Sequence, residues 1–297
     1  MSRATSSPHP LDAASVRVSR RRNRTRPAVS VILVAGLGLV LSACSAPSRP
    51  GTSPSSGGSS PALSGEITVL AAASLTESFD TIGAAFTVAN PQTVVTFSYG
   101  SSATLATQVT NGAPADVFAA ANETTMDTVE KAGLAVGRID FASNVLEIAV
   151  PAGNPAKISG LTDFADESKK IILCAEEVPC GSAAIRVFAL AKITPKPDSY
   201  EADVKAALSR VTPARAGGRA EADAALVYAT DVRAAGDQVE GIAFPDAQKA
   251  ANVYPITSLS ESENADLAAA FVAYVLSPKG QKVLTDAGFS QPEAAGP

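Results

Sequence analysis

Residues 67–88, which read ITVLAAASLTESFDTIGAAFTV, hold the pattern that decides the fold. The first four are β-branched or apolar and predict a short buried strand. Apolar side chains then recur at helical spacing over residues 74–88: Leu75, Phe79, Ile82 and Phe86. Ser74 and Glu77 have the spacing of a capping box, which indicates a helix start. A strand followed directly by a helix is the repeating unit of an α/β fold.

The same alternation continues along the rest of the sequence. Short apolar runs predict strands at residues 94–97, 116–118, 145–150, 170–173, 225–228 and 253–259. Helical spacing predicts helices at residues 103–110, 124–132, 182–192, 202–211 and 265–276, and a last one that begins at Ser277-Pro278. This pattern predicts an α/β fold with two mostly parallel sheets of four or five strands.

The N-terminal segment has the composition of an export signal. Residues 20–26 are rich in arginine. They are followed by an apolar run at residues 29–41, which is too short to span a bilayer. The run ends in Leu41-Ser-Ala-Cys44, which resembles the bacterial lipobox. The resemblance implies that residues 1–43 are removed as a signal peptide and that the Cys44 thiol is lipidated. The alternative is an uncleaved N-terminal helix with a chance cysteine.

The segment after Cys44 has the composition of a flexible tether. Of residues 45–64, 15 of 20 are Ser, Pro or Gly, a composition that cannot bury a core. We therefore expect residues 44–65 to link the lipidated cysteine to a folded part that begins near Glu66. The expected location is outside the cell, anchored by lipid to the outer face of the cell membrane.

The composition of the remaining chain excludes several classes of function. Its one histidine, His9, lies in the predicted signal, so Ser-His-Asp and Cys-His catalysis and His-ligated metals are excluded. Acidic side chains outnumber basic ones after residue 43, which argues against a broad nucleic-acid-binding face. Glycine-rich phosphate loops are absent. We expect no enzyme activity, no metal cation and no cofactor.

Two cysteines remain after Cys44. Cys174 and Cys180 are six residues apart, and in an oxidising compartment they could close a small disulfide loop. The alternative is two free buried thiols. A metal site would lack further ligands, and the spacing is not that of a C-x-x-C redox pair.

Four segments at the starts of predicted helices are the candidates for chemistry. They are residues 71–77, 99–105, 177–182 and 202–205. Each offers backbone N–H groups without a helical partner and the positive end of a helix dipole. Several helix starts aimed at one point would make an anion site without a charged side chain.

The residues of these segments resemble the molybdate-binding proteins of bacterial ABC importers. The similarity is carried by residues 67–76 (ITVLAAASLT), by 100–109 (GSSATLATQV) and above all by 111–118 (NGAPADVF). Further segments follow in the family's order: Asn144-Val-Leu, Val178-Pro-Cys-Gly181, Asp203-Val204, Ala225 to Asp231 and Gly288-Phe289. The resemblance extends from Glu66 to Phe289.

The resemblance implies the two-lobed periplasmic-binding-protein fold, with a ligand cleft between the lobes. One lobe would comprise residues 66–143 and 232–297, and the other residues 144–231. The oxyanion, molybdate or tungstate, would be held by neutral donors: the hydroxyl and N–H of Ser74 and of Ser102, the N–H of Cys180, the N–H of Val204 and the hydroxyl of Tyr228. Cys180 stands where many relatives have alanine.

The implied partner is the membrane permease of a molybdate ABC transporter, and the implied state is a monomer. Three alternatives stay open. The ligand could be sulfate, thiosulfate or another tetrahedral oxyanion. The chain could be an exported hydrolase with a serine nucleophile, or a lipid-anchored adhesin that uses the same fold without transport.

Overall fold

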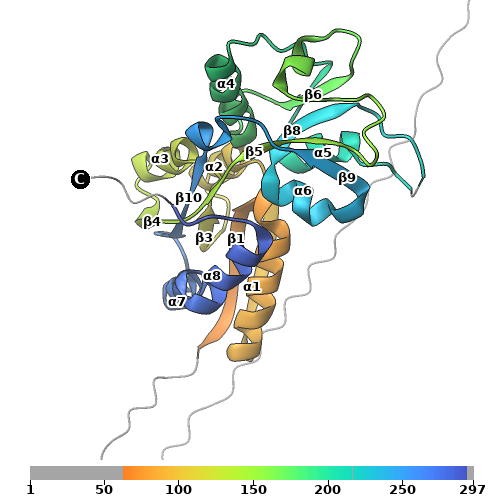
Figure 1. Cartoon of the computed structure of the whole chain (residues 1–297). Coiled ribbons are helices and arrows are strands. Elements are labelled where there is room, and N and C mark those ends of the chain that lie inside the picture. Colours follow the sequence, from red (N-terminus) through yellow and green to blue (C-terminus); the bar gives the residue numbers. More distant parts are fainter. Residues whose placement is uncertain (1–62, 216, 293–297) are drawn as a thin grey trace, which may run out of the picture. The chain divides into compact units, whose positions relative to one another are not determined.

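Two open sheets flanked by helices make up the part of the chain that the structure describes, residues 63–215 and 217–292 of a computed structural model (Figure 1). In spatial order, the first sheet contains β2 (Gln92–Gly100), β1 (Ser64–Ala72), β3 (Val117–Ala119), β10 (Asn252–Leu259) and β4 (Ala135–Asn144). The second contains β7 (Ser199–Glu201), β6 (Ile171–Cys174), β8 (Ala224–Tyr228), β5 (Leu146–Pro151) and β9 (Val239–Ile242). The predicted signal peptide, Cys44 and residues 45–62 of the predicted tether lie outside the described residues.

Helices cover both sheets. Around the first lie α1 (Thr76–Ala89), α2 (Ser102–Thr110), α3 (Glu123–Lys131), α7 (Ala265–Leu276) and α8 (Pro278–Ala287). Around the second lie α4 (Pro179–Ala191), α5 (Val204–Val211) and α6 (Ala229–Ala235). Short 3₁₀ turns occur at η1 (Ala73–Leu75), η2 (Leu161–Ala165), η3 (Gly236–Gln238) and η4 (Ala247–Ala250). None of the helices in the described part of the chain is long and apolar enough to cross a bilayer.

The α/β fold class with two sheets is confirmed, but the pairing is mixed rather than mostly parallel. In each sheet two strand pairs are parallel and two are antiparallel. The reason lies in the connection between the sheets. Strand β4 leaves the first sheet and β10 returns to it, so these neighbours run in opposite directions.

The first sheet has a core on each face. On one face, Ile67 and Val69 of β1 pack with the aromatic rings of α1 and α7, including Phe79 and Phe271. Leu70, which points to the other face, packs with a second apolar cluster under α2 and α3. Alternate residues of β1 thus pack into the cores on the two faces of the sheet. Because β1 is packed on both sides, the position of its C-terminal end is fixed. Helices α1, α7 and α8 gather together (Figure 1).

The second sheet is buried along its central strands. Every residue of β6 and β8 is buried, which is typical of strands covered on both faces. Their apolar runs end at Cys174 and Tyr228, where the chain enters loops and helices. The core of this sheet therefore holds the carboxyl ends of its strands in place.

The second passage between the sheets lies later in the chain than predicted. The first is close to the predicted position, since β4 ends at Asn144 and β5 begins at Leu146. The resemblance implies that residues 232–250 belong to the first lobe, but β9 pairs with β5 in the second sheet, and Phe244 and Ala250 belong to its core. We therefore use "first lobe" for residues 64–144 and 252–289, and "second lobe" for residues 146–250.

Candidate functional site

A small cavity lies between the two lobes at the carboxyl ends of their strands. Its volume is about 20 Å³, and since a water needs roughly 10–15 Å³, only one small ion or molecule fits. The lining residues are Ala72, Ala73, Ser74, Gly100, Ser101, Ser102, Ala121, Val178, Pro179, Cys180, Asp203, Val204 and Tyr228. All five predicted site residues are among them.

Helix starts surround this cavity. The turn η1 leads into α1, and α2, α4 and α5 begin at Ser102, Pro179 and Val204. The first N–H groups of a helix have no partner within it and carry partial positive charge. Because Pro179 has no N–H, the first donor of α4 is Cys180. The cavity is therefore built to receive negative charge.

The Ser102 hydroxyl accepts one hydrogen bond from the protein. Its Oγ accepts a hydrogen bond from the backbone N–H of Ala121, at 2.9 Å, and the residue is almost fully buried. This bond uses one of the two lone pairs of the oxygen, and the hydroxyl proton is available to a group inside the cavity.

The Tyr228 hydroxyl also accepts a hydrogen bond from another part of the protein. Tyr228 is the last residue of β8 and is 1% exposed. Its oxygen accepts a hydrogen bond from Nδ2 of Asn252, at 2.7 Å. Burial raises the pKa of the Tyr228 hydroxyl well above its usual value, so the group keeps its proton at any physiological pH.

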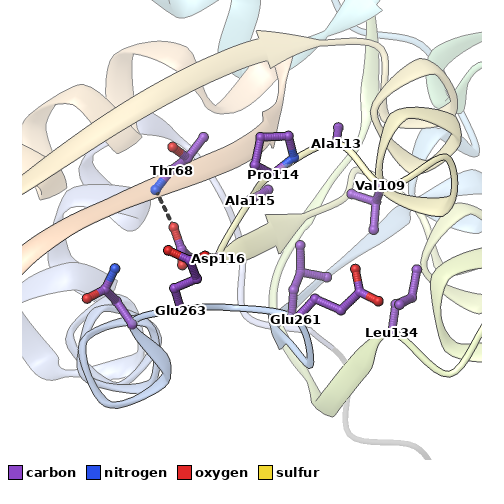
Figure 2. A pocket seen from close by; sticks show the side chains of 12 residues that line it. Thr68, Val109, Ala113, Pro114, Ala115, Asp116, Leu134, Glu261 and Glu263 are labelled. Atoms are coloured by element: carbon purple, nitrogen blue, oxygen red, sulfur yellow. Dashed lines mark hydrogen bonds between the residues drawn. The ribbon is translucent and has the colours of Figure 1, made fainter. Parts of the chain in front are cut away.

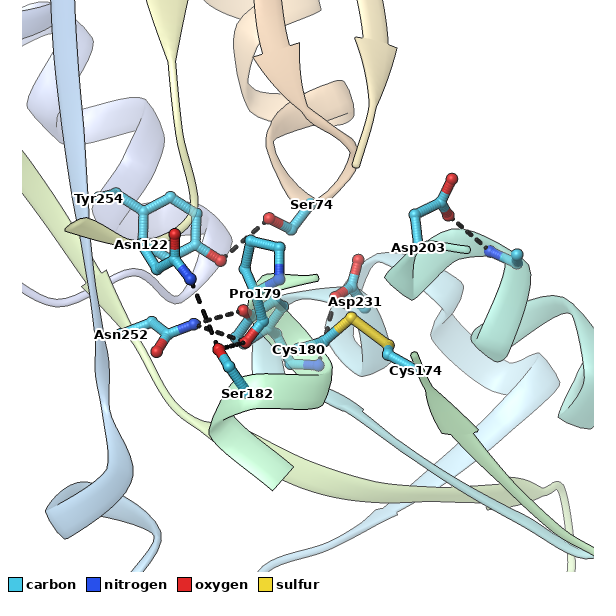
Figure 3. The surroundings of a disulfide bond; sticks show 12 residues. Ser74, Asn122, Cys174, Pro179, Cys180, Ser182, Asp203, Asp231, Asn252 and Tyr254 are labelled. Atoms are coloured by element: carbon cyan, nitrogen blue, oxygen red, sulfur yellow. Dashed lines mark hydrogen bonds between the residues drawn. A yellow bond between two sulfur atoms is a disulfide. The ribbon is translucent and has the colours of Figure 1, made fainter. Parts of the chain in front are cut away.

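Ser74 is not a helix cap. Helix α1 has no side-chain cap, and the Ser74 Oγ instead lies 2.9 Å from the hydroxyl of Tyr254, as Figure 3 shows. Glu77, the other half of the predicted capping box, forms an ion pair with Lys205, with Nζ and Oε1 2.8 Å apart. Both side chains are drawn into contacts with residues distant in the sequence, and these contacts replace the local cap.

The predicted disulfide is present and ends at the cavity. It joins Cys174, the last residue of β6, to Cys180 in the first turn of α4 (Figure 3). The next residue, Gly181, has no room for a side chain, because a Cβ would lie 1.8 Å from the carbonyl oxygen of Ala175. The start of α4 is thus held closely against the end of β6, and with it the N–H of Cys180.

Val204 lines the cavity and is the first residue of α5. The preceding residue, Asp203, caps α5, and its Oδ1 accepts the N–H of Ala206 at 2.9 Å (Figure 3). The Asp203 carboxylate is thus engaged in capping its own helix. Of the described residues that line the cavity, none is Lys or Arg. An anion here would be held by neutral donors.

Ser101 is a site residue that the sequence reasoning did not assign. It lines the cavity and is buried, and among residues 63–215 and 217–292 its Oγ has no hydrogen-bond partner. A buried hydroxyl without a partner is costly, and a ligand could satisfy it. The signal available in the sequence was the hydroxyl pair Ser101-Ser102 at a helix start.

A larger hollow in the first lobe does not suit an anion. It lies near the amino end of β3 and has a volume of about 290 Å³. Asp116, Glu261 and Glu263 line it (Figure 2). Asp116 has a structural role, since its Oδ2 accepts the N–H of Thr68 at 2.7 Å. Within the described residues, no group of three or more His, Cys, Asp or Glu could hold a metal ion.

Comparison with known proteins identifies the family. The family described as bacterial extracellular solute-binding protein matches residues 67–290. This chain belongs to that family. A solute-binding protein carries its ligand and is not an enzyme, and its family acts outside the cytoplasm.

Relatives of this solute-binding protein include proteins named for molybdate. It is 38% identical to the molybdate-binding protein ModA of Mycobacterium tuberculosis over 265 residues, which cover 89% of this chain and 96% of the relative. It is 32% identical to ModA of Haemophilus influenzae, over 77% of this chain and 91% of that one. A solved structure from Clostridium difficile, the substrate-binding domain of a molybdenum ABC transporter, is similar with a TM-score of 0.57 and 28% identity, over 77% and 99% of the two chains.

Proposed function

We propose that this solute-binding protein captures molybdate, or the similarly sized tungstate, for an ABC importer. Two kinds of observation support the proposal. The relatives that cover nearly the whole chain are named for molybdate binding. The cavity between the lobes is small, helix starts surround it, and none of the described residues that line it is Lys or Arg.

The observation that carries the proposal is the direction of the hydroxyl groups. Ser102 and Tyr228 each accept a hydrogen bond from another part of the protein, so each has a proton to give to a ligand. The helix starts add N–H donors. A fully deprotonated tetrahedral dianion needs donors on all four oxygens, and hydrogen bonds to a charged group contribute about 1.5–3 kcal/mol each. Hydrogen phosphate would bring an O–H without an acceptor.

We propose that the five predicted residues hold this ligand through fixed donors. These are the hydroxyls and N–H groups of Ser74 and Ser102, the N–H of Cys180, the N–H of Val204 and the hydroxyl of Tyr228. Ser101 adds one further hydroxyl. No cofactor is required, because the bound oxyanion is the cargo itself.

The proposed partner is a membrane permease, to which the rims of the two lobes would deliver the ligand. A signal peptide over residues 1–43 would direct export, and a lipid on Cys44 would anchor the protein to the outer face of the cell membrane. The tether after Cys44 would leave the lobes free to reach the permease. We propose that the protein acts as a monomer.

Calorimetric titration of the full chain tests the ligand. We expect tight binding of molybdate and tungstate, and binding of sulfate and phosphate at least about 100-fold weaker, equivalent to about 3 kcal/mol. Sulfate has the charge and shape of molybdate, so its rejection depends on the size of the cavity. Sulfate binding as tight as molybdate binding would make the protein a general oxyanion carrier. Absence of molybdate binding would refute the proposal.

A further inference from the structure

Asn252 lies at the point where the chain returns from the second lobe to the first. It is the first residue of β10, and it pairs with Asn144 at the end of β4. Its side chain is 3% exposed and does not line the cavity. All of its side-chain hydrogen bonds reach residues of the second lobe. It therefore links the connecting strand to the groups that line the site.

The contacts of Asn252 allow only one orientation of its amide. Its Oδ1 accepts a hydrogen bond from Nη2 of Arg186. Its Nδ2 donates to the carbonyl oxygen of Pro179, at 3.1 Å (Figure 3), and to the hydroxyl oxygen of Tyr228, at 2.7 Å. Turning the amide over would set NH₂ against a guanidinium and oxygen against a carbonyl. Arg186 only donates and the carbonyl only accepts, so they fix the amide.

Arg186 is held in its own place by the backbone. Its Nη1 donates to the carbonyl oxygen of Ser182, at 3.3 Å, and its Nη2 also donates to that of Ala250, at 3.2 Å. These contacts join α4 to the residues just before β10. These two contacts fix the position of the Arg186 guanidinium relative to the Asn252 side chain.

The fixed amide decides what the Tyr228 hydroxyl can do. A phenol oxygen has one proton to give and accepts one strong hydrogen bond on its other side. Because Asn252 donates to the Tyr228 oxygen, the Tyr228 proton points away from Asn252, and Tyr228 lines the cavity. The Tyr254 hydroxyl, which also neighbours Tyr228, lies 2.9 Å from the Ser74 Oγ. The amide thus makes Tyr228 a donor toward the ligand.

We infer that Asn252, oriented by Arg186 and Pro179, is a positioning residue that turns the Tyr228 proton into the cavity and thereby selects fully deprotonated oxyanions. This inference rests on the proposed function, because it concerns how the same site tells molybdate from protonated phosphate. Asn252 acts through Tyr228 and does not touch the ligand. Most of its effect on the ligand therefore depends on the Tyr228 hydroxyl.

The test is a cycle of variants titrated calorimetrically with molybdate. In Asn252→Asp, a carboxylate replaces the NH₂ donor, stays paired with Arg186, and attracts the Tyr228 proton away from the ligand. We expect molybdate affinity to fall about 10- to 150-fold, the loss of one hydrogen bond to a charged group. In the Tyr228→Phe background the same substitution is expected to cost clearly less affinity, because only its charge and its altered contact with Pro179 then act.

A second variant keeps the inference falsifiable if the first folds poorly. In Asn252→Ala the accepting side of Tyr228 is free, so the hydroxyl can accept from the O–H of inorganic phosphate. We expect the ratio of molybdate to phosphate affinity to fall at least about tenfold at pH 7. Thermal melting of each variant checks that the fold persists.

The outcomes separate this inference from the proposed function. If the wild-type chain does not bind molybdate, the proposed function fails. If it binds molybdate and Tyr228→Phe weakens the binding, but Asn252→Asp costs the same with and without the hydroxyl, the positioning role is wrong. An unchanged molybdate-to-phosphate ratio in Asn252→Ala would also overturn it.

Discussion

Lys205 and Glu77 belong to different lobes, yet the Lys205 Nζ lies 2.8 and 2.9 Å from the two carboxylate oxygens of Glu77. Lys205 directly follows Val204, and Glu77 is three residues after Ser74, so the ion pair joins the two lobes next to the cavity. The same Nζ lies 3.2 Å from Oδ1 of Asp231, which is buried. A cation between two carboxylates therefore holds the lobes together beside the site.

Removing the Glu77 charge should weaken ligand retention. Glu77 is more than half exposed, so we expect a contribution of about 0.2–1 kcal/mol and a dissociation constant for molybdate raised up to about fivefold in Glu77→Gln. The effect should shrink in high salt, which screens exposed charges. The control is Asp286→Asn, whose partner Lys282 lies on the same helix, α8. Equal effects of the two substitutions in titrations would contradict a role for the contact between the lobes.

Asp231 should make stability depend on pH. Burial raises its pKa to about 6, against the opposing attraction of Lys205. In the unfolded state the Asp231 carboxyl has an ordinary pKa near 3.9. At a pH between these two values, Asp231 is therefore protonated in the native state and ionised in the unfolded state. Stability relative to Asp231→Asn should therefore fall as the pH rises from about 4 to about 6, and stay level above that. Urea unfolding of both chains across this range gives the difference, and parallel curves would refute the assignment.

The Cys174–Cys180 bridge should support both stability and affinity. It ends at Cys180, whose N–H is a proposed ligand donor. Reduction frees the start of α4, and we expect a lower melting temperature and roughly three- to tenfold weaker molybdate binding, about 0.7–1.4 kcal/mol. The matched control is the double variant Cys174→Ala, Cys180→Ala, which should not respond to reductant. A response of that variant would show that the reductant acts elsewhere.

The sequence predicted the elements with strong periodicity and missed those that depend on their neighbours. Strand β1 and helix α1 carry clear apolar patterns, and both are present. Strand β4 was missed because its first half is largely exposed and contains Gly137 at positive φ and the charged residues Arg138 and Asp140. Its pairing with β10 has two register shifts, so no regular alternation marks it.

In the candidate site, too, the local features could be predicted from the sequence and the long-range contacts could not. The helix starts are local features, and the sequence placed Ser74, Ser102, Cys180 and Val204 at them. The groups that orient the site are long-range: Ser74 and Tyr254 are 180 positions apart, and Tyr228 and Asn252 are joined only by folding. No spacing rule brings such pairs together. For the same reason, the capping-box interpretation of Ser74 and Glu77 was wrong.

The proposed lipid anchor predicts a change of location. Cys44→Ala removes the thiol that would carry the lipid, so the protein should be released into the medium or remain unprocessed. Fractionation of cells into membrane and soluble material, with blotting for the protein, measures this. A control substitution at Ser45 should leave the protein with the membrane. A Cys44→Ala protein that still fractionates as a lipid-anchored species would refute the lipobox interpretation.

The two kinds of donor in the site should respond differently to alanine. In the proposed site Ser102 donates through its hydroxyl, and Ser102→Ala also leaves the N–H of Ala121 without its acceptor. We expect a loss of about 1–3 kcal/mol in molybdate binding, or roughly 5- to 150-fold in affinity. In the proposed site Val204 donates through its N–H, which Val204→Ala keeps, so the loss of affinity in this variant should be much smaller. Calorimetry measures both affinities, and thermal melting separates binding from stability. Equal losses in the two variants would contradict the assignment of Val204 as a backbone donor.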